Sequence, residues 1–448
     1  MLVHFIAIGG AAMHNLALAL HEKSYLVTGS DDAIFNPSKT RLEQAGICPS
    51  VMGWFPEKVS SDLDAVILGM HARSDNPELL KAQELGLPIY SYPEFLYEQS
   101  KNKTRIVIGG SHGKTTITSM ILHVLQHLKI DSDYMVGAQL AGFTTMVKLS
   151  EAPIIVLEGD EYLSSPIDLR PKFHLYKPHI ALISGIAWDH INVFPTFENY
   201  LSQFQIFINK IEDSGYLTYC STDVELNTIA KSNTSISVEP YILPSYKIVD
   251  GKTFIEFDKK FIPLEIFGEH NLINMMGAFN VCKQLEVSES SFLNAMSSFK
   301  GASHRLEKIY SRKGLQVFKD FAHSPSKVKA TVKAVKSQFV GYNIIAALEL
   351  HTFSSLNKTF LSEYKNSMNG VDTAIVYFDP EAITHKKLEN LSANLVFDSF
   401  ARKDLSVLTN SNKLCRLIES EISDNTILLL MSSGNFGGLV LEDFARSL

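Results

Sequence analysis

Short apolar runs alternate with longer amphipathic stretches through the first hundred residues. Residues 3–8, 25–28 and 65–68 are apolar and rich in β-branched side chains, and a glycine–alanine turn separates the first run from a helical stretch that ends near residue 20. Alternation of this kind predicts right-handed βαβ units around a parallel sheet. The polar stretch 98–105 (EQSKNKTR) then predicts a linker.

A second cycle starts with the apolar run 106–108, a glycine-rich turn and a helical stretch to about residue 128. The runs 154–157 and 180–184 are apolar throughout, which is typical of strands buried on both faces. From Gly215 the pattern predicts β-structure, with Asp250-Gly251 as a type I′ hairpin turn. The segment GEHNLINMMGAFNVC reads as a loop entering a helix.

Alternation returns after Gly301, with predicted strands over residues 317–318, 344–348, 374–378 and 427–431. The pattern therefore predicts an α/β protein of three domains in series. We expect a Rossmann-like N-terminal domain over 1–101, a central P-loop-type ATPase domain with a parallel sheet over 102–302, and a Rossmann-like C-terminal domain over 303–448.

Composition agrees with three domains and narrows the class of partner. The 448 residues are 45% hydrophobic, and the net charge of −7 gives no reason to expect a nucleic-acid or anionic-membrane partner. The four cysteines lie far apart without a CxxC pair, which predicts free thiols in a reducing compartment. Neither a signal peptide nor an apolar run of about 20 residues is visible, so we expect a cytoplasmic protein.

The sharpest chemical signal is GGSHGKTT, between an apolar strand and a helix. Glycines let backbone N–H groups turn towards phosphate oxygens, and the helix N-terminus adds its dipole. Lys114 can neutralise phosphate charge and the Thr115 hydroxyl can bind Mg²⁺. The first glycine of the full phosphate-loop pattern is replaced by Ile108, so a plain strand-to-helix turn is the alternative. The predicted nucleotide-binding residues are Gly110, Ser111, His112, Gly113, Lys114, Thr115 and Thr116.

Carboxylates follow two predicted strands of the same domain. Glu158-Gly159-Asp160-Glu161 follows one strand, and Asp189-His190 follows the next. Carboxyl ends of parallel strands share one edge of a sheet, where nucleotide and metal bind in this class. Mg²⁺ prefers hard oxygen ligands. Each segment alone is more often a solvated loop, but together with the phosphate loop they favour a metal site.

Two other segments are weaker candidates. The turn Gly9-Gly10-Ala11-Ala12, with Asp31 after the second strand, resembles a dinucleotide fingerprint in which alanine replaces two glycines; a tight turn without a ligand is the alternative. In the last third, Arg305 and the cluster from Asp320 to Pro325 stand out, although His323 alone is more typical of a hydrogen-bonded loop histidine. No cysteine or histidine has a recognisable nucleophilic partner, which excludes a hydrolase reading.

Read together, these motifs resemble the Mur ligases over the whole chain. HFIAIGGAAM with VTGSD looks like the family's UDP-binding start, GGSHGKTTITSM like its phosphate loop, and LEGDEY like its metal-binding segment. GEHNLINMMGAFNV is similar to the family's adenine-binding helix, and DFAHSPSK to its D-Y-x-H-H-P segment. The departures are Ala12, Gly159, Phe321 and Ser324. The resemblance implies substrate contacts by Gly9, Gly10, Ala11, Ser30 and Asp31, and ATP contacts by Asn271, Asn274, Arg305 and Asp320.

The resemblance implies an ATP- and Mg²⁺-dependent ligase that joins the carboxylate of UDP-N-acetylmuramate to an amine through an acyl phosphate. Thr115, Glu158 and His190 would bind Mg²⁺, Lys114 would stabilise the moving phosphoryl group, and His323 would orient or assist the amine. We expect a monomer or homodimer.

Two further segments bear on the identity of the amine. EYLSSPIDLRPKFHLYKP and MSSGNFGG look like the branch that attaches the tripeptide L-alanyl-γ-D-glutamyl-meso-diaminopimelate. Free L-alanine is the closest alternative. A nicotinamide-dependent dehydrogenase and a non-catalytic nucleotide-binding protein are alternatives of other classes; the weakened first turn counts against the former, and the retained Lys114, Thr115, Glu158 and His190 against the latter.

Overall fold

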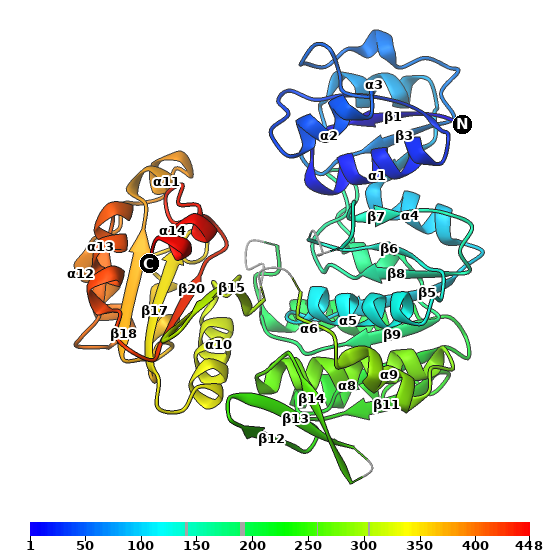
Figure 1. Ribbon diagram of the computed structural model, residues 1–448. Helices are drawn as coiled ribbons and strands as arrows, with labels where there is room; N and C mark the ends of the chain where they lie inside the picture. Colours follow the sequence, from blue (N-terminus) through cyan, green and yellow to red (C-terminus); the bar gives the residue numbers. More distant parts are fainter. Residues whose placement is uncertain (139–141, 189–192, 258, 303–304) are drawn as a thin grey trace. The chain divides into compact units, whose positions relative to one another are not determined.

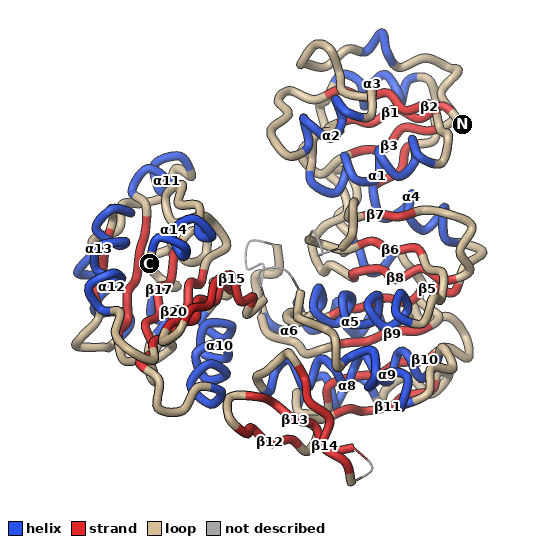
Figure 2. Tube along the Cα trace, in the orientation of Figure 1, coloured by secondary structure: helices blue, strands red, loops and turns tan. Residues whose placement is uncertain are grey.

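The computed structural model describes residues 1–138, 142–188, 193–257, 259–302 and 305–448. Its chain forms two compact units, one of Met1–Ile242 with Ile273–Met296, the other of Leu243–Leu272 with Ser297–Leu448. The described strands make four sheets, two in each unit (Figures 1 and 2). No helix among the described residues is long and apolar enough to cross a membrane.

The first sheet is parallel, with strand order β2-β1-β3-β4. Its strands are buried by apolar side chains such as Val3, Phe5 and Ile67. The strands are β1 (Leu2–Ile6), β2 (Leu26–Ser30), β3 (Ala65–Leu68) and β4 (Ile89–Ser91), and the accompanying helices are α1 (Ala11–Glu22), α2 (Ser38–Gln44), η1 (Pro56–Lys58), α3 (Pro77–Glu84) and α4 (Tyr92–Ser100).

The predicted linker over 98–105 is wrong at both ends. Helix α4 runs to Ser100 and the next strand starts at Thr104, so only three residues connect them. Arg105, one of the charged residues of the polar stretch that predicted a linker, is 3% exposed. Its guanidinium donates to the carbonyl oxygens of Ser100, Tyr176 and other residues, which satisfies the buried charge.

The second sheet of the first unit has strand order β11-β10-β9-β5-β8-β6-β7 and is parallel except for the β6–β7 pair. Figure 1 shows α5 and α6 packed along it. The strands are β5 (Thr104–Gly109), β6 (Asp133–Met135), β7 (Val147–Lys148), β8 (Ile154–Glu158), β9 (Ile180–Ile183), β10 (Tyr216–Cys220) and β11 (Ser237–Tyr241), and the helices of this part are α5 (Lys114–His127), η2 (Lys172–Leu175), α6 (Phe197–Ile208), α7 (Val224–Ala230), α8 (Glu269–Gln284) and α9 (Glu289–Met296).

The prediction of β-structure alone after Gly215 is wrong in part. Strands β10 and β11 are parallel neighbours, and helix α7 connects them. The Asp223 carboxylate caps that helix by accepting a hydrogen bond from the N–H of Leu226 (2.9 Å). The capping residue marks a helix start that the β-rich flanks concealed.

The second unit contains an antiparallel sheet of β12 (Tyr246–Val249), β13 (Lys252–Phe257) and β14 (Lys260–Leu264). Asp250 and Gly251, between β12 and β13, have φ of 50° and 70°, so the predicted hairpin turn is confirmed. The other sheet has strand order β15-β16-β20-β17-β18-β19, with only the β15–β16 pair antiparallel. Its elements are β15 (Glu307–Arg312), β16 (Leu315–Asp320), α10 (Pro325–Gln338), β17 (Asn343–Leu350), η3 (Leu361–Tyr364), β18 (Thr373–Phe378), α11 (Pro380–His385), α12 (Ala393–Phe400), β19 (Ser406–Leu408), α13 (Ser411–Glu421), β20 (Thr426–Met431) and α14 (Leu441–Ser447).

The predicted α/β class with parallel sheets is confirmed. The compact units do not follow the predicted domain limits, because residues 243–272 cluster with the C-terminal part of the chain and the first turn of α8 goes with them. The limits 1–101, 102–302 and 303–448 therefore stay predictions.

Candidate functional site

The glycine-rich turn joins β5 to α5 through backbone that only glycine adopts easily. Gly110 has φ of +120°, and a Cβ on it would lie 2.2 Å from Ser184 Oγ. Gly113 precedes the first turn of α5 with φ of +80°, and a Cβ there would lie 2.6 Å from the Asn274 Oδ1. The loop is thus closed by neighbours on two sides, which fixes the direction of its N–H groups towards the start of the helix.

Lys114 is the first residue of α5 and its ammonium is engaged inside the site. Its Nζ donates to the carbonyl oxygen of Gly110 (2.8 Å) and to Glu161 Oε2 (2.6 Å). Burial lowers the pKa of Lys114, but the negative charges of Glu161 and Asp160 outweigh it and raise that pKa above its ordinary value. The side chain is therefore a cation held at the mouth of the phosphate loop.

Thr115 and Glu158 bring two hard oxygen donors together beside Lys114. The Thr115 hydroxyl donates to Glu158 Oε1 (2.8 Å), and the N–H of Gly137 donates to Glu158 Oε2 (2.8 Å). Glu158 is 8% exposed. These oxygens fit Mg²⁺, which takes few protein ligands and completes its shell with water and phosphate oxygens. Among the described residues no three acidic, histidine or cysteine side chains gather as a metal site, and the predicted ligand His190 lies outside the described residues.

Glu161 is a site residue that the sequence reasoning did not single out. Its carboxylate is 1% exposed, pairs with Lys114 and accepts a hydrogen bond from the Tyr200 hydroxyl (3.1 Å). The Tyr200 hydroxyl also hydrogen-bonds Ser111 Oγ (2.8 Å), which accepts from the N–H of Ala187 (2.9 Å). In the sequence, the only signal for Glu161 is its position three residues after Glu158, at the end of the same strand.

The two asparagines of α8 have different surroundings. Asn274 belongs to the first unit and lies against Gly113 of the phosphate loop. Asn271 belongs to the second unit and donates from Nδ2 to the carbonyl oxygen of Phe267 (2.9 Å). The structure thus brings Asn274 to the loop, whereas the contact it gives to Asn271 is within the turn at the start of the helix.

The N-terminal turn after β1 is braced by Asp31. Asp31 Oδ2 accepts a hydrogen bond from the N–H of Gly9 (2.7 Å), and burial raises the pKa of this carboxyl group. Ala7, in the place of a fingerprint glycine, keeps a positive φ of 69°. Gly10 and Ala11 lead into α1, and the buried Ser30 accepts through its carbonyl from the N–H of Ala7 (2.9 Å). The predicted substrate residues therefore lie on two adjacent segments, the turn between β1 and α1 and the end of β2.

Asp320 ends strand β16 in the second unit and its carboxylate is taken up by the protein's own donors. Oδ2 accepts from the N–H of Leu306 (2.7 Å), and Oδ1 accepts from the N–H of Ala322 (2.8 Å) and from the Thr331 hydroxyl (3.2 Å). The residue is 8% exposed. In this structure Asp320 fixes the two segments that flank it in space.

Arg305 and His323 are arranged around the ring of Phe321. The Arg305 guanidinium lies 4.6 Å from the ring centroid, a cation–π contact, and the His323 ring meets it edge-on at 5.1 Å. His323 Nδ1 is 2.7 Å from the carbonyl oxygen of Phe321. Ser324 Oγ is buried and makes no hydrogen bond among the described residues. The departure from tyrosine at position 321 thus leaves an aromatic platform in place.

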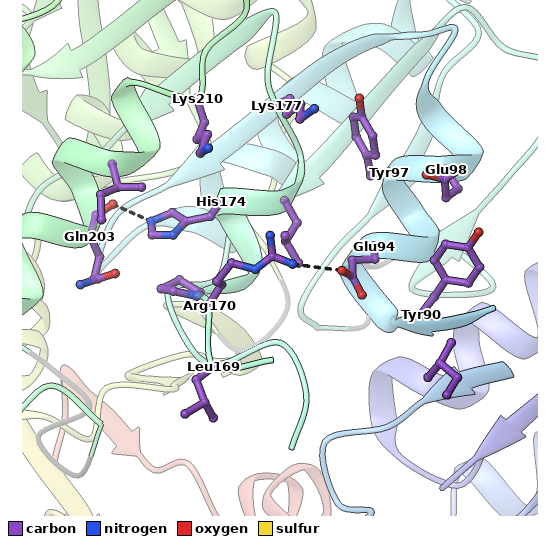
Figure 3. Close-up of a pocket in the computed structure, with 14 residues that line it drawn as sticks. Tyr90, Glu94, Tyr97, Glu98, Leu169, Arg170, His174, Lys177, Gln203 and Lys210 are labelled. Carbon is purple, nitrogen blue, oxygen red and sulfur yellow. Dashed lines mark hydrogen bonds and ion pairs between the residues drawn. The ribbon is translucent and has the colours of Figure 1, made fainter. Parts of the chain in front are cut away.

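A cavity of about 780 Å³ in the first unit is separate from these groups (Figure 3). It lies between α4, the η2 segment and α6, and the Arg170 guanidinium crosses it to Glu94 (3.1 Å). None of the phosphate-loop residues lines it. The candidate ATP site is therefore the edge of the seven-stranded sheet and not this cavity.

Comparison with known proteins identifies the family. Three family models match in series: "Mur ligase family, catalytic domain" over residues 2–104, "Mur ligase middle domain" over 108–282 and "Mur ligase, glutamate ligase domain" over 304–434. The UDP-N-acetylmuramate–L-alanine ligase of Clostridium kluyveri is 30% identical, covering 97% of this chain and 95% of its own. The enzyme of that name from Caldicellulosiruptor bescii is 33% identical, covering 83% and 82%.

Solved structures agree on the fold. The UDP-N-acetylmuramate–alanine ligase of Thermotoga maritima superposes with a TM-score of 0.74 at 20% identity, covering 100% of this chain and 98% of its own. The murein peptide ligase of Psychrobacter arcticus gives 0.66 at 22% identity, with the same coverage. The predicted family is confirmed: the chain belongs to the Mur ligases, which are ATP-dependent ligases that form C–N bonds.

Proposed function

We propose that this chain joins the carboxylate of UDP-N-acetylmuramate to the amine of L-alanyl-γ-D-glutamyl-meso-diaminopimelate, releasing ADP and phosphate. The observation that carries the ligase chemistry is the convergence of Lys114, Thr115 and Glu158 at one end of the phosphate loop. Similarity to named relatives that act on UDP-N-acetylmuramate supports the sugar substrate.

The carboxylate needs activation because oxide is a poor leaving group. Transfer of the γ-phosphoryl group of ATP gives an acyl phosphate, and the neutral amine then attacks its carbonyl carbon and expels phosphate. Both steps bring anions together, so the protein contributes mainly position and charge. Lys114, at the mouth of the phosphate loop, stabilises the charge of the phosphoryl group during its transfer.

The other predicted site residues bind and orient the metal ion, ATP and the UDP-sugar. Thr115 and Glu158, with His190, would hold Mg²⁺, which would supply charge neutralisation at the phosphates. Adenine is assigned to Asn274 and Asn271 of α8. Arg305 binds the ATP phosphates. Asp320 holds the segment that carries Arg305, because its carboxylate accepts a hydrogen bond from the N–H of Leu306. The UDP-sugar binds the turn of Gly9, Gly10 and Ala11 together with Ser30 and Asp31 at the end of β2.

Side chains at the carboxyl edge of the six-stranded sheet favour a peptide with carboxylate groups as the substrate that supplies the amine. Phe353, just after β17, is 62% exposed, and Lys386 Nζ lies 5.1 Å from its ring centroid. An exposed aromatic ring beside a cation suits the carboxylates of a tripeptide, whereas alanine needs only a small closed site. His323, at the end of β16, orients the peptide or accepts the proton of the attacking amine.

L-Alanine is the second candidate, favoured by the names of the curated relatives. The chemistry would be unchanged and only the amine would differ. The test is phosphate release from ATP with Mg²⁺ and UDP-N-acetylmuramate, with tripeptide and L-alanine compared as the added amine. Release stimulated by tripeptide alone, with a product of matching mass, supports the proposal. Stimulation by alanine alone assigns the second candidate, and stimulation by neither contradicts both.

A further inference from the structure

The lysine of the phosphate loop, Lys114, is held in an ion pair with Glu161. Phosphate loops use their lysine to attract anions, yet here the ammonium is already 2.6 Å from a carboxylate oxygen. The Lys114 side chain is 15% exposed and that of Glu161 is 1% exposed, so water screens the pair little. An incoming triphosphate has to compete with a charged partner that the fold places there.

The surrounding charges strengthen this competition. Asp160 and Glu158 also act on Lys114, and both favour its charged form. Among the described residues of this group, the second lysine is Lys172, which pairs with Asp160 at 2.5 Å. The described carboxylates of the group therefore outnumber the described lysines, and an ATP tetra-anion that reaches Lys114 also meets the repulsion of these carboxylates.

Glu161 is also fixed from its other side. The Tyr200 hydroxyl donates to Glu161 Oε1, and Ser111 of the phosphate loop hydrogen-bonds the same hydroxyl. Strand β8, the loop and α6 are thus joined around one carboxylate. A side chain tethered in this way does not swing out of the site to make room for phosphate.

We propose that Glu161 is a positioning residue that makes the phosphate loop select metal-bound over metal-free nucleotide. Metal-free ATP has to draw Lys114 from Glu161 while its phosphates face that carboxylate. Nucleotide carrying a divalent cation brings the charge that offsets this carboxylate, so Lys114 can contact phosphate without abandoning Glu161. The inference rests on the ATP dependence of the family and not on the identity of the amine.

The test is nucleotide binding by the Glu161→Gln variant, which keeps the side-chain shape and removes the charge. ATP affinity is measured calorimetrically on the full chain, once with Mg²⁺ and once with EDTA, without sugar or amine. We expect the ratio of the two dissociation constants to shrink by at least about tenfold, mainly because metal-free ATP binds more tightly. An unchanged ratio would overturn the proposal.

Two matched variants separate charge from structure. Tyr200→Phe removes one hydrogen bond to Glu161 and leaves its charge and its ion pair with Lys114, so the ratio should shrink much less than in Glu161→Gln. Glu161→Asp restores the charge and should recover most of the ratio; if Glu161→Gln does not fold, this variant and the wild type at rising ionic strength carry the test. A ratio in Glu161→Asp as small as in Glu161→Gln, or a wild-type ratio independent of salt, would contradict the electrostatic role. Because no amine is present, failure of the substrate assignment leaves this test intact.

Discussion

Glu158 and Asp320 occupy equivalent positions at the ends of strands in two regions of the molecule, but their side chains have different roles. Each is an acid at the carboxyl end of a buried parallel strand, and each is 8% exposed. Glu158 accepts hydrogen bonds from the hydroxyl of Thr115, a phosphate-loop side chain, and from one backbone N–H group, that of Gly137. Asp320 accepts from two backbone N–H groups, those of Leu306 and Ala322, and from the Thr331 hydroxyl.

The difference lies in what a ligand would have to displace. The Thr115 hydroxyl can keep its hydrogen bond to the Glu158 carboxylate and still offer a lone pair of its oxygen to a cation. The Thr115–Glu158 pair is therefore already close to a metal-binding arrangement. Backbone N–H groups have no second role, and an Asp320 that left them would expose buried donors. A strand-end acid therefore signals a ligand only when its partners can also serve that ligand.

Lys114→Ala should have the largest effect, because it removes the cation of the phosphate-loop edge. We expect kcat to fall by about 10³-fold, since Lys114 acts on charge that develops during phosphoryl transfer. UDP-N-acetylmuramate affinity, measured by calorimetry, should change little. Equal losses in turnover and in sugar affinity would contradict the role of Lys114.

Glu158→Gln should have the next largest effect, because an amide is a poorer ligand for Mg²⁺ than a carboxylate. A fall in kcat of about 10²-fold is expected, with a rise in the Mg²⁺ concentration needed for half-maximal rate. Thr115→Ser, which keeps the hydroxyl, is the matched control and should retain most activity. A Glu158→Gln enzyme with unaltered Mg²⁺ dependence would remove Glu158 from the metal site.

Asp320→Asn tests the other member of the pair and should act on stability. The amide would turn an N–H donor towards the N–H of Leu306 or Ala322, at a cost of about 2 kcal/mol in the free energy of unfolding. Denaturant unfolding measures this loss, and the KM for ATP should rise with it, because the segment that carries Arg305 loses part of its support. A raised KM for ATP at unchanged stability would instead place Asp320 in direct contact with the nucleotide.

Asp31→Asn should have the smallest effect and a characteristic pH dependence. Burial raises the pKa of Asp31, so ionisation disfavours the folded state, and the stability this group contributes at low pH is lost as pH rises through its folded pKa. The asparagine variant lacks this loss. Its unfolding free energy relative to the wild type should therefore be more favourable at pH 7 than at pH 4. The opposite sign would mean that the Gly9 N–H contact outweighs burial.

The apolar runs were sufficient to locate several of the parallel strands. The prediction for residues 65–68 matches β3, and the runs 154–157 and 374–378 each fall within one residue of a strand's limits. The phosphate loop was visible because glycines, lysine and threonine are adjacent in the chain. The β10–α7–β11 unit was missed because its short helix is recognisable mainly from the Asp223 cap.

What the residues determined by themselves is therefore local: strand periodicity, the glycines whose φ is positive, and the order of motifs that marks the family. The partners of each charge were decided by tertiary structure, since Glu161 lies 47 residues from Lys114, and Arg105 donates to the carbonyl of Tyr176, 71 residues away. A buried charge needs a partner at about 3 Å, and only folding decides which distant group supplies it.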